Sequence, residues 1–348
     1  MFEKSFITDC EGPLTLNDNA FELCAHFIED GDELFKILSL YDDYLVDEVK
    51  KDNYKAGNTL KLILPFFVVE NLKNEDLINF SREHIYVVND SRFLLKYLQS
   101  AMNTYIVSTS YGQYIEAVSN FMEFPFENTY YTDVDMDELN LIDEEILKIA
   151  EFKKQILENP KNYELFDDIF FSEIPKMGIY ENIKNIDVIG GEGKKLAIDD
   201  IISRDNININ EILYIGDSIT DVEPLRFARE HDGISISFNG NDYSLREAQI
   251  AIVSPTAIAT AVIANIYANN DKKAVLTFID DYNNSDNIKK LFEDYKIDSQ
   301  INEEFFRIFK NIKYPLIKIV DSDNFEDILK ESIEMRNRIR GEDVGGLG

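Results

Sequence analysis

The chain has 348 residues, 45% of them hydrophobic, and a formal net charge of −31. This negative charge excludes nucleic acid and anionic membrane surfaces as favoured partners, because both would repel the protein. The length exceeds the roughly 250–300 residues at which a single core stops growing, so we expect one main domain with accessory parts. A phosphorylated ligand would need local cations, such as a divalent metal ion, to approach this chain.

The sequence predicts neither membrane insertion nor export. No apolar run approaches the roughly 18 residues of a membrane span, and the first ten residues lack the apolar core of a signal peptide. We therefore expect a soluble, cytoplasmic protein. Its two cysteines, Cys10 and Cys24, stand without a CxxC motif or a histidine at ligand spacing, which indicates neither a disulfide framework nor a zinc site.

Along the chain, segments typical of strands alternate with segments typical of helices. Residues 5–9 resemble a buried strand, and residues 17–83 place apolar side chains at the three- and four-residue spacing of helices. Beyond them the pattern predicts helices at 90–101, 111–123, 194–204, 221–231 and 256–269, and strands at 104–108, 211–217, 233–238 and 248–253. This alternation predicts an α/β fold with a doubly wound parallel sheet.

The same pattern predicts five regions. They are a core of residues 1–15, 86–125 and 186–271, a helical cap at 16–85 inserted after the first strand, an acidic and mostly helical insertion at 126–185, a C-terminal accessory segment at 272–340, and a flexible tail at 341–348.

Polar side chains follow three of the predicted strands. Asp9, Ser108 and Asp217 each stand where a strand ends, and Asp221 comes four residues after Asp217. Ligands of open α/β sheets bind outside the carboxyl ends of the strands, so these side chains are expected to meet there. Each one alone has a common structural explanation as a turn or helix-cap residue. Their combined order, with Lys194 between the second and third, favours a shared site.

In this order the motifs resemble those of the haloacid dehalogenase superfamily of aspartate-nucleophile phosphohydrolases. The sequence "DCEG" from Asp9 resembles its first motif, Ser108 the second, Lys194 the third, and the pair Asp217 and Asp221 the fourth. The run "IVSTSYGQYIEAVSNF" is similar to the phosphoserine phosphatase branch, which also has a helical cap. The resemblance implies a Rossmann-like core and a Mg²⁺-dependent phosphatase acting on a small phosphorylated metabolite.

The resemblance also implies roles for the site residues. Asp9 would attack phosphorus and form an aspartyl-phosphate. Mg²⁺ would be held by Asp9, the backbone carbonyl of Glu11 and Asp217, while Asp221 would orient a metal-bound water or hold Lys194. Lys194 and Ser108 would stabilise the phosphoryl group. Glu11 would act as general acid and base, at a position where the superfamily usually has Asp and a few phosphoserine phosphatase relatives share "DxEG".

A narrower resemblance gives the alternative function. The stretches "FITDCEGPLTLNDNAFEL" and "GDSITDVEPL" resemble an archaeal family of methanogens named as subunit R of energy-converting hydrogenase A. This implies a non-catalytic or regulatory protein that binds subunits of a hydrogenase complex. Two cysteines cannot ligate an iron–sulfur or nickel centre, so hydrogenase chemistry itself has no support in the sequence. The substrate, and the choice between phosphatase and phosphotransferase, stay open at this point.

Overall fold

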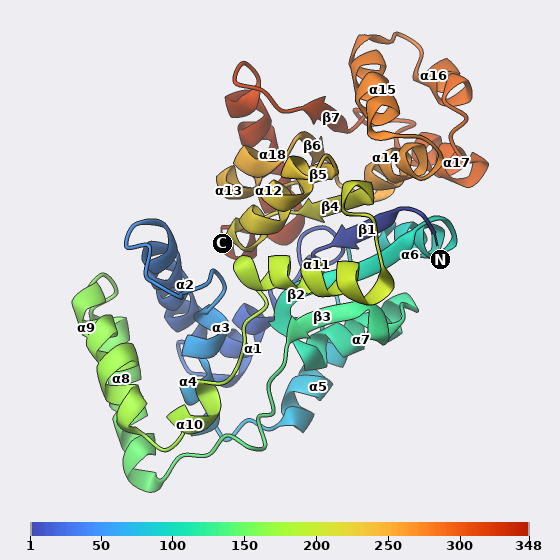
Figure 1. Cartoon of the computed structure of the whole chain (residues 1–348). Coiled ribbons are helices and arrows are strands. Elements are labelled where there is room, and N and C mark those ends of the chain that lie inside the picture. Colours follow the sequence, from blue (N-terminus) through green and yellow to red (C-terminus); the bar gives the residue numbers. More distant parts are fainter. Residues whose placement is uncertain (1, 347–348) are drawn as a thin grey trace.

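The computed structural model describes residues 2–346 and contains one seven-stranded sheet with helices on both faces and a helical cap beside it (Figure 1). The strand order is β3-β2-β1-β4-β5-β6-β7, and only the β6–β7 pair is antiparallel among the strands of this sheet. The predicted α/β class is confirmed. The strands are β1 (Ser5–Thr8), β2 (Asn103–Tyr111), β3 (Thr129–Thr132), β4 (Ile212–Gly216), β5 (Ile234–Phe238), β6 (Ile250–Val253) and β7 (Leu316–Ile319).

The sheet is buried on both faces, which explains its nearly continuous apolar strands. On β1, Phe6 packs into the core on one face and Ile7 into the core on the other, because neighbouring side chains of a strand alternate. The first face is covered by α6 (Ser91–Ala101), α7 (Gly112–Met122) and α14 (Ile258–Asn269). The opposite face is covered by α11 (Glu192–Asp205) and α12 (Val222–Glu230), with α13 (Asp242–Glu247) near its edge.

The cap is built from two separate stretches of chain. Five of the cap's α-helices lie between β1 and β2, and three more lie between β3 and α11. They are α1 (Asn19–Phe27), α2 (Gly31–Asp47), α3 (Thr59–Leu62), α4 (Leu64–Val69) and α5 (Asn74–Glu83), then α8 (Asp143–Glu158), α9 (Tyr163–Asp168) and α10 (Tyr180–Ile183). Leu38 and Phe67 of the first stretch share one hydrophobic cluster with Ile149 and Phe166 of the second. The range 126–185, predicted as one insertion, thus contains an edge strand of the sheet, β3, and cap helices.

The C-terminal segment extends the sheet and returns to the middle of the molecule. Helices α15 (Lys272–Asn284), α16 (Ile288–Asp294) and α17 (Ser299–Ile308) join the core that contains α14. After β7, α18 (Phe325–Arg340) runs back over the sheet, and the described end of the chain lies between the sheet and the cap (Figure 1).

The predicted tail 341–348 contains a short helix, α19 (Glu342–Gly345), while residues 347 and 348 lie outside the described part of the chain. Asp343 of α19 pairs with Lys36 of the cap at 2.7 Å. Val344 packs against the cap's hydrophobic cluster. The end of the chain therefore contacts the cap as well as the core.

None of the helices described in residues 2–346 is both long enough and apolar enough to span a lipid bilayer.

Candidate active site

The strand order reverses direction at β1, and the predicted site residues gather there. Asp9 directly follows β1, and Asp217 follows its neighbour β4, with the backbone N–H of Asp9 donating to the carbonyl of Ile215 at 2.9 Å. Carboxylate oxygens of Asp9, Asp217 and Asp221 lie within 4.8 Å of one another, and all three side chains are buried. The parallel register of β1 and β4 thus brings together acids more than 200 positions apart in sequence.

Lys194 joins two of these acids. Its Nζ lies 2.7 Å from Oδ2 of Asp9 and 2.7 Å from Oδ1 of Asp221, in a place with no solvent exposure for the lysine. Burial disfavours the lysine charge, but the carboxylates of Asp221 and Asp9 outweigh it and raise the pKa of Lys194. We call Asp9, Lys194 and Asp221 the lysine triad. It carries a formal charge of −1.

Asp221 is held rigidly by further hydrogen bonds. It accepts one from the hydroxyl of Tyr214 at 2.7 Å and two from the backbone N–H groups of Asp217 and Ser218, at 3.0 and 3.1 Å. Although burial opposes ionisation, Lys194 holds the pKa of Asp221 below its usual value. Of the two roles expected for Asp221, this geometry fits the one in which it holds Lys194.

Asp9 lies in a position suited to a nucleophile. One carboxylate oxygen accepts a hydrogen bond from the backbone N–H of Cys10 at 2.6 Å, and the other pairs with Lys194. Burial raises the pKa of Asp9, and the ammonium of Lys194 opposes that rise. The side chain of Asp9 is therefore held from two directions.

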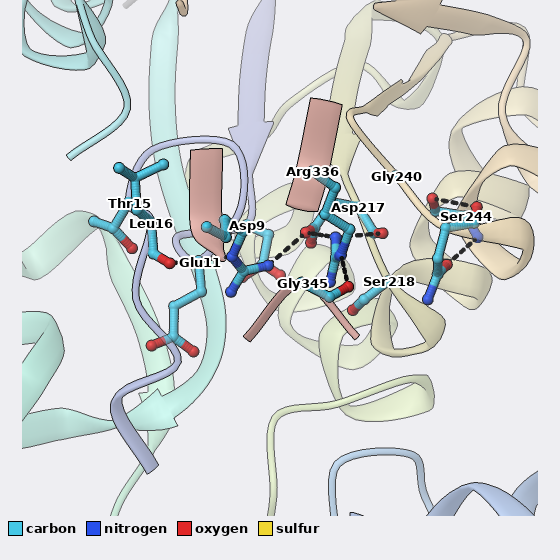
Figure 2. Close-up of polar contacts among 12 residues, drawn as sticks. Asp9, Glu11, Thr15, Leu16, Asp217, Ser218, Gly240, Ser244, Arg336 and Gly345 are labelled. Carbon is cyan, nitrogen blue, oxygen red and sulfur yellow. Dashed lines mark hydrogen bonds and ion pairs between the residues drawn. The ribbon is translucent and has the colours of Figure 1, made fainter. Parts of the chain in front are cut away.

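Asp217 has a different set of partners, which come from the C-terminal helix α18. Arg336 directs Nη1 at Oδ2 of Asp217 (Figure 2). Arg340 directs its own Nη1 at the same oxygen, at 3.1 Å. We call Asp217, Arg336 and Arg340 the arginine triad, with a formal charge of +1. Both arginine side chains are at most 5% exposed.

The sequence analysis missed these two arginines. The available signal was a pair of arginines at helical spacing, Arg336 and Arg340, near the end of a chain in which acids outnumber basic residues 66 to 35. A phosphate-binding site in such a chain needs cations, and the sequence analysis considered only Lys194. In the structure Lys195 turns away and pairs with Asp199 at 2.6 Å.

Glu11 is half-buried and points away from Asp217 (Figure 2). Its Oε1 accepts a hydrogen bond from the backbone N–H of Asn19, at the start of α1, at 2.7 Å. Burial, with the nearby carboxylate of Asp18, raises the pKa of Glu11 well above its ordinary value. A raised pKa favours the protonated form of a carboxyl group, and that form can serve as a proton donor.

Ser108 lies beside these groups near the carboxyl end of β2. Its hydroxyl donates to Oγ of Ser110 and accepts from the backbone N–H of Ser110, both at 3.2 Å. Between them, Thr109 has a buried hydroxyl oxygen without a hydrogen-bond partner among the described residues. A buried hydroxyl without a partner is costly, so this group points to a polar ligand.

A cavity of about 100 Å³ lies between the core and the cap at this point. Core residues and both arginines line one side, and cap residues including Phe35, Thr59 and Leu60 line the other. Organic ligands usually occupy pockets of about 300–1,000 Å³, so this arrangement holds a small polar group.

The donor set fits a hard divalent cation such as Mg²⁺, which prefers carboxylate and carbonyl oxygens. Asp9 and Asp217 are the side chains positioned to hold it. Gly12 lets the loop after β1 approach them, because its φ is +96° and a Cβ there would lie 2.1 Å from Oδ2 of Asp217.

No family model and no curated protein matches this chain. A solved structure of a gene product from Archaeoglobus fulgidus is 26% identical, covers 99% of both chains and has a TM-score of 0.81. Structures of phosphoserine phosphatase are also similar. A phospho-aspartyl intermediate analogue is 13% identical over 72% of this chain and 93% of that chain, with a TM-score of 0.46, and a substrate-bound complex is 14% identical over 74% and 95%, with a TM-score of 0.47.

The Archaeoglobus protein has the same fold along almost the whole length, which includes the C-terminal segment.

Proposed function

We propose that this protein is a Mg²⁺-dependent phosphohydrolase that acts on a small phosphorylated metabolite, with Asp9 as its nucleophile. The observation that carries the proposal is the buried lysine triad next to Asp217, under a small polar cavity. A buried lysine between two carboxylates keeps its charge and offers it to an incoming phosphoryl group. The unpartnered hydroxyl of Thr109 in the cavity wall supports a polar ligand.

In the proposed reaction an oxygen of Asp9 attacks phosphorus, and the bond between phosphorus and the leaving oxygen breaks. The protonated carboxyl of Glu11 gives its proton to that oxygen, so that the alcohol leaves neutral. A water molecule then attacks the phosphorus of the aspartyl-phosphate, and Glu11 takes a proton from that water. Inorganic phosphate leaves, and Asp9 is restored. Bound Mg²⁺ would supply positive charge to the phosphoryl oxygens.

The first test is hydrolysis of p-nitrophenyl phosphate and of a panel of phosphorylated metabolites by the purified full chain, with and without Mg²⁺. We expect Mg²⁺-dependent release of phosphate, and a loss of about 10³-fold or more in Asp9→Asn, because the nucleophile is gone. Lys195→Met is the matched control, since Lys195 lies outside the site and should leave the rate unchanged. No hydrolysis of any member of the panel would reject the proposal.

The second test separates the role of Glu11 from that of Asp9. Loss of a general acid costs about 10²–10⁴-fold, and the cost is largest when the leaving oxygen is strongly basic. Glu11→Gln should therefore slow the hydrolysis of alkyl phosphates much more than that of p-nitrophenyl phosphate. Equal losses on both kinds of substrate would show that Glu11 does not protonate the leaving group.

Association with hydrogenase subunits stays a prediction from the sequence resemblance. Co-purification of such subunits with the Asp9→Asn protein would support it, because binding would then be independent of catalysis.

A further inference from the structure

The two triads together balance their charges without any ligand. The lysine triad contributes −1 and the arginine triad contributes +1, and their six side chains are all at most 7% exposed. The six side chains of the two triads taken together are thus formally neutral. Buried charges interact far more strongly than charges in water, so any net charge added there is costly.

This neutrality changes what the site can accept. A divalent cation alone would add two positive charges beside three buried cations. A phosphate dianion alone would add two negative charges beside three buried carboxylates. A cation and a dianion bound together add no net charge, so their joint binding costs the least.

The arginines can stay in the site while Asp217 takes a new partner, because each guanidinium has other anchors. Arg336 Nε donates to the carbonyl of Gly345 at 2.8 Å. Arg340 donates to the carbonyls of Leu16 at 3.1 Å and Asn17 at 2.6 Å. Both arginines line the cavity, where a planar guanidinium matches the oxygens of a phosphate.

The helix that carries the arginines is itself fixed to the core. Ser332, one turn before Arg336, donates from its hydroxyl to the carbonyl of Gly240 at 2.7 Å. Ser332, Arg336 and Arg340 follow one another at four-residue spacing, so they share one face of α18. That face of α18 therefore forms part of the wall of the site.

We propose that Arg336 and Arg340 are positioning residues that make this site bind a divalent cation and a phosphate dianion as a pair. Each ligand should raise the affinity for the other, since coupling between two sites is reciprocal. The inference rests on the proposed function in using a metal and a phosphate, and it goes further by naming the residues that couple them.

The test is a calorimetric titration of Mg²⁺ into the full-length protein, with and without saturating inorganic phosphate, corrected for binding of Mg²⁺ to phosphate in solution. Inorganic phosphate is the probe, so no turnover is needed. We expect phosphate to tighten Mg²⁺ binding by about tenfold or more. Equal Mg²⁺ affinity with and without phosphate, or no Mg²⁺ binding in either case, would overturn the inference.

Two variants of the same helix show whether the arginines cause the coupling. Arg340→Gln removes a positive charge from the site, and Arg338→Gln removes the same charge from the exposed face two residues away. In Arg340→Gln we expect tighter Mg²⁺ binding without phosphate and a gain from phosphate of less than about threefold. Arg338→Gln should behave as the wild type. If both variants behave alike, the arginines are not the source of the coupling.

Arg336→Gln should show the same change as Arg340→Gln, but Arg336 is more deeply buried and its variant is the one at risk of unfolding. The Arg340 and Arg338 pair therefore decides the question alone. Coupling without hydrolysis of any substrate would keep this inference and reject the phosphohydrolase. Hydrolysis without coupling would support the phosphohydrolase and reject this inference.

Discussion

The lysine triad and the arginine triad lie side by side but are built by different parts of the chain. The lysine triad joins residues after β1 and β4 to the first turn of α11, all within the sheet and its covering helices. The arginine triad joins the loop after β4 to a C-terminal helix 119 positions away. The first has one cation for two acids, and the second has two cations for one acid. The difference predicts unequal tolerance to the loss of a cation.

The largest effect is expected from Lys194→Met. It leaves the buried carboxylates of Asp9 and Asp221 without their shared cation, and breaking such a pair costs about 3–5 kcal/mol of unfolding free energy. Chemical denaturation of the wild type and the variant measures this loss. Lys195→Met is the control on the same helix, because its pair with Asp199 lies near the surface and is worth about 0–1 kcal/mol. A loss below about 1 kcal/mol for Lys194→Met would show that the lysine triad does not stabilise the fold.

The next largest loss of stability is expected at Gly12, where the loop after β1 contacts Asp217 of the arginine triad. Gly12 and Gly341 both have positive φ, at +96° and +81°, so alanine is strained at both. At Gly12 the new Cβ would also meet Asp217, whereas nothing lies within 4 Å at Gly341. We expect Gly341→Ala to cost about 1 kcal/mol, and Gly12→Ala to cost about 2–4 kcal/mol because crowding adds to the strain. Equal losses in thermal unfolding would mean that contact with Asp217 is unimportant.

Arg336→Met should cost less than Lys194→Met, and this comparison tests the difference between the triads directly. Asp217 keeps Arg340 as its partner, so no buried carboxylate is left without a cation. We expect a loss of about 1–3 kcal/mol, mostly from hydrogen bonds such as that to the carbonyl of Gly345. If Arg336→Met proves as damaging as Lys194→Met, the two arginines do not substitute for one another.

The sequence analysis reached the sheet and the acids of both triads because their signals are local. An apolar run that ends in Asp9 or Asp217 shows both the strand and the residue presented at its carboxyl end. Lys194 was found through its position between the strand-end residues Ser108 and Asp217, and the family resemblance then gave it a role. The strand β3 was missed because only four residues, Thr129–Thr132, form it, within an acidic segment, and it pairs with β2 alone at the edge of the sheet.

The arginine triad could not be derived in this way, because the docking of α18 depends on contacts distant in sequence. Arg338 is exposed, while Arg336 and Arg340 on the same helix reach Asp217. A stretch of arginines shows that a helix is charged, but it does not show which face the fold will bury. The packing of α2 against α8 in one hydrophobic cluster of the cap could not be predicted either, because it too depends on contacts distant in sequence.

The smallest effect concerns Glu22 of α1, next to the anchors of Arg340. The backbone carbonyl of Asn17 accepts a hydrogen bond from Arg340. The side chain of Asn17 donates from Nδ2 to both carboxylate oxygens of Glu22, at 3.0 and 2.7 Å. Burial raises the pKa of Glu22 to about 7, against the hydrogen bonds of Asn17, which lower it. The folded protein thus binds this proton more tightly than the unfolded chain does. Its contribution to stability is complete below the unfolded pKa of about 4.3 and is lost as the pH rises through about 7.

Glu22→Gln removes this proton but keeps an oxygen that can accept from Asn17. The unfolding free energy of the wild type should fall between pH 5 and pH 8 by about 1–2 kcal/mol more than that of the variant, after allowance for the partial exposure of the group. Denaturation at the two pH values measures this difference. Glu33→Gln, an exposed glutamate of α2, should keep the wild-type pH dependence. If Glu22→Gln also keeps the wild-type pH dependence, Glu22 is ionised as readily in the folded protein as in the unfolded chain. The region around Asn17, which anchors Arg340, is then less well shielded from water than its burial indicates.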